Sequence, residues 1–127
     1  MKEFLFFKAG KDYFKLRLSE ILFIQAEKKH THFVTATKSY ATAYSIGYIE
    51  KLLPQNLFCR VHRSYIISLL HTERFNNELA YIGKKKIPIG REYKNLLKNA
   101  VLMLSCEEKP ITLDDGDVNK LLENIDL

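Results

Sequence analysis

Residues 60–69, RVHRSYIISL, place three cationic or potentially cationic side chains directly before an apolar run. Isoleucine, valine and tyrosine favour a half-buried strand, whereas a buried arginine needs a charged or hydrogen-bonding partner. The segment is therefore expected to display a cationic edge and then enter a core. Because strand alternation separates neighbouring side chains, we expect His62 to hold the turn through a backbone hydrogen bond and Arg63 to project outward. Arg60 fits either role.

A second polar cluster, Lys28-Lys29-His30-Thr31-His32, separates two strand-like runs. Together with the Cys59-x-x-His62 pair, its two histidines could suggest a metal or thiol site. However, the pattern lacks a defined fourth ligand and an orienting acid. We therefore expect neither an enzyme nor a cofactor or metal, and interpret the cluster as a binding loop.

Charge is unevenly distributed along the 127 residues. Residues 1–104 carry 18 Lys and Arg against 8 Asp and Glu, whereas residues 105–127 carry 2 against 7. A basic body of this kind is typical of a protein that binds polyanions, because each cation that meets a phosphate releases condensed counterions. We expect a basic domain over 1–104 and an acidic C-terminal extension over 105–127.

The length and the 46% hydrophobic content suit a single folded unit with a real core. The apolar runs are too short to cross a bilayer, and the N-terminus becomes charged too soon for a secretory signal. The two cysteines, Cys59 and Cys106, are far apart and cannot build a disulfide framework or a four-thiolate zinc site. We expect free thiols and a cytoplasmic protein without membrane contact.

The periodicity predicts a mainly β body. Phe14, Leu16 and Leu18 alternate with cations after a turn at Gly10, which indicates a hairpin with residues 4–7. Ser45 is the expected cap of a short helix that ends before Pro54. Further strand-like runs cover residues 21–25, 33–37, 40–44, 58–67, 73–75, 78–82 and 86–89.

Two helices are expected near the C-terminus. From Arg91 the period changes, and an apolar stripe at helical spacing runs to Leu104. Asp114 opens a second helix with acids in its first turn, and Val118, Leu121, Leu122 and Ile125 on one face.

Three motifs in register resemble the LytTR family, DNA-binding output domains of bacterial transcription regulators. Residues 58–67, FCRVHRSYII, follow that family's F-x-R-x-H-R-S-Y-hydrophobic pattern. Residues 21–27, ILFIQAE, are similar to the strand before its first recognition loop, and residues 87–93, IPIGREY, to its closing signature. The family usually has serine where Gly90 stands and asparagine where Ser68 stands.

The resemblance implies an elongated, multi-sheet β fold with short helices that inserts loops into successive major grooves. The positions it implies for DNA binding are Lys28, Lys29, His30, His32, Arg63, Ser64, Arg91 and Lys94. Arginine can grip guanine bidentately, whereas Ser64 and Lys94 are better suited to phosphates. The lysines at 84–86 fit a phosphate contact or a solvated turn equally well. The family also implies paired protomers, or a homodimer, on direct repeats of double-stranded DNA, and an output domain standing alone or excised from a longer protein.

Two other functions stay open at this stage. Non-specific nucleic-acid binding would depend on the positive charge alone. Single-stranded nucleic-acid binding needs exposed aromatic side chains, but the periodicity predicts that Phe4, Phe6, Phe14, Phe33 and Tyr93 pack in the core. A protein-interaction module would use the C-terminal face at Val118, which could pack on its own body, on another chain, or over the basic surface. Packing on its own body is the simplest expectation.

Overall fold

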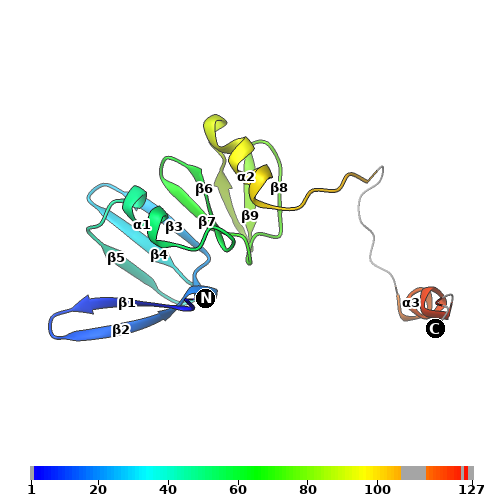
Figure 1. Ribbon diagram of the computed structural model, residues 1–127, viewed down its shortest axis with the longest axis horizontal. Helices are drawn as coiled ribbons and strands as arrows, with labels where there is room; N and C mark the ends of the chain where they lie inside the picture. Colours follow the sequence, from blue (N-terminus) through cyan, green and yellow to red (C-terminus); the bar gives the residue numbers. More distant parts are fainter. Residues whose placement is uncertain (1, 107–113, 124, 126–127) are drawn as a thin grey trace.

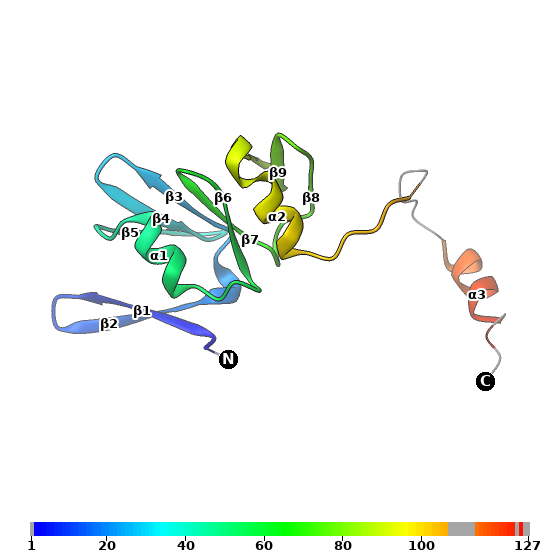
Figure 2. The same cartoon turned by 45° about the horizontal axis from the view of Figure 1, so that its top comes forward.

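The computed structural model describes residues 2–106, 114–123 and 125. Three antiparallel sheets follow one another along this part of the chain, with short helices against them (Figures 1 and 2). The mainly β fold with several sheets and short helices is thus confirmed. The part of the chain that is described contains no helix long and apolar enough to span a bilayer.

The first sheet is a hairpin of β1 (Phe4–Ala9) and β2 (Asp12–Arg17), followed by the 3-10 turn η1 (Leu18–Glu20). Gly10 has a φ of 64°, which suits the tight turn that the sequence predicted. The second sheet has the strand order β5-β4-β3-β7-β6. Its strands are β3 (Phe23–Glu27), β4 (His30–Val34), β5 (Ser39–Thr42), β6 (Phe58–His62) and β7 (Tyr65–Ser68).

The third sheet has the order β10-β9-β8. Its strands are β8 (Arg74–Phe75), β9 (Leu79–Ile82) and β10 (Lys85–Pro88). The helices are α1 (Ile46–Leu52), η2 (Arg91–Tyr93), α2 (Lys94–Ala100) and α3 (Asp115–Glu123). Ser45 caps α1 as predicted, because its Oγ accepts a hydrogen bond from the Tyr48 amide at 3.1 Å.

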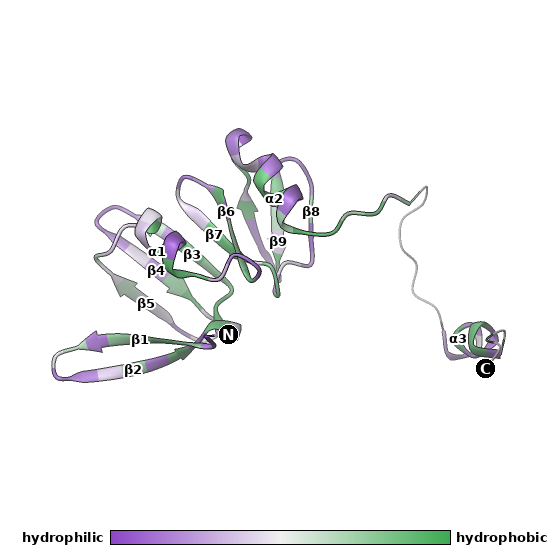
Figure 3. Ribbon diagram, in the orientation of Figure 1, coloured by the Kyte–Doolittle hydropathy of each residue, from purple (hydrophilic) through white to green (hydrophobic). Residues whose placement is uncertain are grey.

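The five-stranded sheet is buried on both faces, which explains why its strands contain adjacent apolar residues. Ile66 and Phe58 face α1 and the hairpin, whereas Ile67 and Cys59 face the third sheet and α2. Hydropathy colouring shows apolar residues along the strands and polar residues at the loops (Figure 3). Two core layers thus hold the central sheet, and the loops at its ends are left for solvent or ligand.

Two predictions about packing are wrong. Phe4, Phe6 and Phe14 are 41%, 54% and 52% exposed, because a two-stranded hairpin cannot cover both of its faces. Phe33 is buried as predicted, and Tyr93 is half-buried. The helix expected to run from Arg91 to Leu104 begins as the 3-10 turn η2 and ends at Ala100, so Leu104 is fully exposed.

The acidic extension forms α3 where a helix was predicted. The Asp114 carboxylate accepts a hydrogen bond from the Asp117 amide at 2.8 Å and caps its first turn. No residue of α3 is buried, so the expected packing of its apolar face on the body is not found.

Candidate nucleic-acid interface

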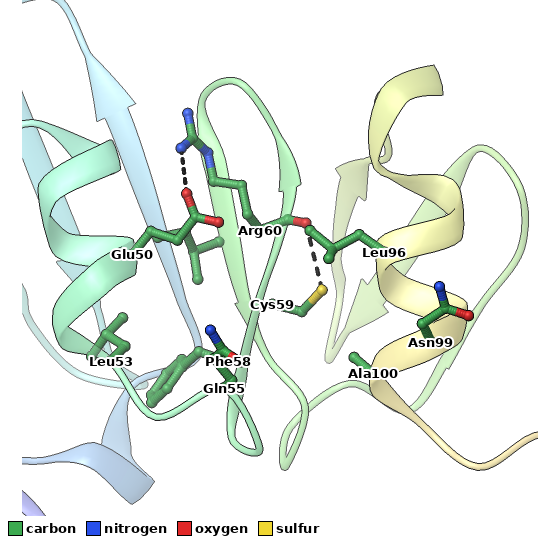
Figure 4. Close-up of a pocket in the computed structure, with 10 residues that line it drawn as sticks. Glu50, Leu53, Gln55, Phe58, Cys59, Arg60, Leu96, Asn99 and Ala100 are labelled. Atoms are coloured by element: carbon green, nitrogen blue, oxygen red, sulfur yellow. Dashed lines mark hydrogen bonds and ion pairs between the residues drawn. The ribbon is translucent and has the colours of Figure 1, made fainter.

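The turn between β6 and β7 is held from inside by Arg60. Its guanidinium donates to the His62 carbonyl at 3.0 Å and to the Arg63 carbonyl at 2.7 Å. A third hydrogen bond, at 2.8 Å, reaches the Glu50 carboxylate of α1 and forms an ion pair (Figure 4). The Arg60 side chain is only 14% exposed. Of the two roles left open for Arg60, the structure shows the supporting one.

His62 holds the same turn, as the sequence predicted. Its Nδ1 accepts a hydrogen bond from the Ser64 amide at 3.1 Å, and its ring packs edge-on against Tyr65. The ladder between β6 and β7 is irregular between Arg60 and His62, which re-aims the residues that follow. Arg63 at the tip is exposed. The side chains of Arg60 and His62 therefore stabilise the turn from within, whereas the side chain of Arg63 faces solvent.

The turn between β3 and β4 is shorter than predicted. Glu27 pairs with His30, so only Lys28 and Lys29 form the turn, whereas His30 and His32 lie within β4. Lys28 has a φ of 54°, the one positive φ among the described non-glycine residues. Left-handed backbone costs a residue with a side chain roughly 1–2 kcal/mol. A strained, exposed lysine at a loop tip is a feature that often accompanies function.

The third segment is the start of η2. Gly90 is its N-cap, with Arg91 exposed and Lys94 half-buried in the first turn of α2. A Cβ at Gly90 would lie 3.2 Å from Tyr93 Cδ2 and 3.7 Å from His62 Cδ2. The distance to His62 is an ordinary van der Waals contact, so η2 packs directly against the β6–β7 turn.

Backbone hydrogen bonds join the three segments. The Ala26 amide in β3 donates to the Ser64 carbonyl at 2.9 Å, and the Gly90 amide donates to the Val61 carbonyl at 2.7 Å. The two views of the fold show the three loops along the same edge of the molecule (Figures 1 and 2). Residues that are far apart in the sequence are thus gathered into one cationic edge.

The cations of this edge are available for a ligand. Within residues 2–106, 114–123 and 125, none of the five basic residues predicted at this edge forms an ion pair. They are Lys28, Lys29, Arg63, Arg91 and Lys94. Because no carboxylate of the described residues forms an ion pair with these side chains, an anionic ligand could bind them without first breaking an ion pair.

Other sites suggested by the sequence do not come together. No group of three or more metal-ligating side chains occurs in the described residues. Burial, and to a smaller extent the nearby Glu50 carboxylate, raise the pKa of the Cys59 thiol to about 11. This thiol is therefore protonated at neutral pH and is a poor nucleophile. Sequence reasoning missed Glu50, whose only signal is an acid on the helix that precedes the motif.

Comparison with known proteins identifies the family to which this chain belongs. The model of the LytTr DNA-binding domain matches residues 11–102. The chain belongs to the LytTR family. The match covers the two turns and η2, and it confirms the family resemblance found in the sequence.

The relatives include sensory transduction proteins. The sensory transduction protein LytT of Bacillus subtilis (strain 168) is 33% identical over 85 residues, which is 62% of this chain and 35% of that protein. LytT of Bacillus anthracis is 37% identical over 70 residues, covering 50% and 28%, respectively. The chain thus spans about a third of the length of these relatives.

A solved structure shares the fold. The LytTr DNA-binding domain of a Bacillus cereus response regulator superposes with a TM-score of 0.67 at 21% identity. The superposition covers 79% of this chain and 97% of that domain.

Proposed function

We propose that this LytTR domain binds double-stranded DNA sequence-specifically and acts as a bacterial transcription regulator in the cytoplasm. Residues 1–104 are the DNA-binding domain and residues 105–127 an acidic extension. The observation that carries the proposal is the edge on which three loops, joined by backbone hydrogen bonds, present cations without ion-pair partners in the described chain. The names of the LytT relatives, sensory transduction proteins, support the regulatory role.

Each residue of the edge receives a role from its chemistry and position. Arg63 and Arg91 are exposed at separate loops and suit bidentate contacts with guanine in the major groove. The third reading segment consists of Lys28 and Lys29 at the β3–β4 turn together with His30 and His32 of β4. Ser64 and Lys94, both half-buried, are placed for phosphate contacts that fix the register. As the family resemblance implies, two protomers bind paired direct repeats.

The test is selection of bound sequences from random duplex DNA at two salt concentrations. We compare the wild-type chain with Arg63→Ala and Arg91→Ala, and with Arg74→Ala as a matched control. Arg74 is an exposed arginine of β8 that packs on the Tyr81 ring at 3.7 Å, outside the three loops.

The expected result is an enriched repeated motif whose base preference relaxes at different positions in the two loop variants. Arg74→Ala should select the wild-type motif. Binding that depends on salt alone, with no enriched motif in any of these chains, would show that the edge attracts DNA without reading it.

One observation favours a second candidate, single-stranded nucleic-acid binding. The hairpin exposes Phe4, Phe6 and Phe14, so the absence of aromatic side chains at the surface no longer argues against it. The Phe4 ring, however, is already covered by Lys15 and Arg17, at 4.8 Å and 5.2 Å from its centroid. Competition between duplex and single-stranded DNA of the same sequence separates the two functions.

A further inference from the structure

A groove lies between the β1–β2 hairpin, β5 and α1. Its volume is about 1000 Å³. Four large apolar side chains that line it are between 48% and 63% exposed, namely Phe14, Tyr44, Tyr48 and Leu52. A contiguous exposed apolar surface of this kind is typical of an interaction site.

The groove is also cationic. Lys38 lines it beside β5, and none of its described lining residues is acidic. An occupant that fits must therefore combine an apolar face with negative charge. The groove runs along the hairpin, and its lining residues do not include Lys28, Lys29, Arg63 or Arg91 (Figures 1 and 2).

The chain itself contains a segment with this chemistry. On α3, the side chains of Val118, Leu121 and Leu122 share one face and are 41–59% exposed. Asp114, Asp115, Asp117 and Glu123 surround this face with negative charge. A helix of 9 residues is marginal on its own in water, and no residue of α3 is buried. The helix therefore needs a surface to pack on.

We propose that α3 of one copy of this chain packs into the hairpin groove of a second copy. The apolar faces match, and the charges of the two surfaces are opposite. The tail departs from α2, and the views of Figures 1 and 2 place α2 and the hairpin at opposite ends of the domain. Within one chain, residues 101–114 would have to pass along the whole domain to reach the groove, whereas a second copy imposes no such path.

This contact is head-to-tail, so the two surfaces that meet are different. It leaves the groove of one copy and the α3 of the other unoccupied, and association therefore continues as concentration rises. The inference is independent of the proposed DNA binding, because none of the three DNA-facing loops lines the groove.

The experiment measures the mass of the full chain in solution by analytical ultracentrifugation over a wide concentration range. The groove variant is Phe14→Asp with Leu52→Asp, and the tail variant is Leu121→Asp with Leu122→Asp. All four side chains are more than half exposed, so the body should keep its fold, which thermal unfolding checks. Leu70→Asp, at a 63% exposed leucine outside the groove, is the matched control.

Wild type and Leu70→Asp should self-associate, and each double variant should lower the association constant by about tenfold or more. The decisive sample is an equimolar mixture of the two variants. One supplies an intact α3 and the other an intact groove, so the mixture should form one-to-one heterodimers that do not grow further.

Three results would overturn the inference. A wild-type chain that stays monomeric at every concentration places α3 elsewhere, including in the groove of its own chain. Self-association that survives in the groove variant means that α3 pairs with another α3. A mixture that remains monomeric shows that the two surfaces do not meet.

Discussion

Replacing Arg60 with methionine tests whether this arginine acts on DNA through the β6–β7 turn. Methionine has a similar length but no donor, so the part-buried His62 carbonyl loses its charged partner. A hydrogen bond to a charged group is worth about 1.5–3 kcal/mol. The Arg63 carbonyl is exposed and can bind water instead. The Glu50 side chain is 40% exposed, so loss of the ion pair adds at most about 1 kcal/mol.

Together these losses predict that Arg60→Met lowers the free energy of unfolding by about 2–4 kcal/mol. Glu50→Gln keeps an oxygen acceptor and should cost about 1 kcal/mol or less. Urea denaturation measures both. Arg74→Met, which removes an exposed arginine, is the control and should change stability by less than about 1 kcal/mol.

DNA binding distinguishes support from contact. With Arg60→Met we expect weaker binding to every sequence, because the turn that carries Arg63 loses its internal hydrogen bonds. The dependence of affinity on salt should stay the same, since Arg60 neutralises no phosphate. If the salt slope instead falls by about 1, Arg60 itself touches the backbone of DNA and the reasoning is wrong.

Three further predictions concern single residues. Lys28→Gly should leave the free energy of unfolding unchanged or raise it by up to about 1 kcal/mol, because glycine adopts the φ of 54° without strain, while DNA affinity falls; a clear loss of stability would contradict this. The pKa of Cys59 is raised from 9.0 to about 11, so its stabilising contribution is complete below pH 9 and is lost as pH rises toward 11. Urea denaturation should show that the free energy of unfolding of the wild-type chain falls by roughly 2–3 kcal/mol over this range. Cys59→Ala should lack this fall, so equal pH profiles for the wild type and Cys59→Ala would contradict the prediction. Gly90→Ser should change stability by less than about 1 kcal/mol, because a better N-cap offsets a small shift of Tyr93 away from the new Cβ; a larger loss by thermal unfolding would mean that the ring cannot move.

Local signals in the sequence predicted much of the fold. The hairpin turn at Gly10 and the cap at Ser45 depend on the residues beside them, and both are confirmed. The role of His62 was predicted from strand alternation. The prediction succeeded because the hydrogen-bond partner of the ring, the Ser64 amide, is only two residues away in the sequence. Local patterns succeed where the interacting groups are close in the sequence.

Other features depend on what lies across the fold. Phe4, Phe6 and Phe14 alternate as core residues do, but only the tertiary arrangement shows that no second sheet covers them. The apolar stripe after Arg91 continues past Ala100, yet Val101 adopts extended backbone with φ −130° and ψ 163°, which ends α2. The support of Arg60 by Glu50 joins two elements that no periodicity relates.

The hydrogen bonds from Ala26 to Ser64 and from Gly90 to Val61 involve only backbone atoms. The spacing of the three loops is therefore independent of the side chains that the loops carry. We therefore expect that substitutions at residues 28–29, Arg63 and Arg91 leave these two hydrogen bonds in place. On the proposed function, a scaffold of this kind would let the binding preference change by a few substitutions in the loops, while the fold that positions them stays constant.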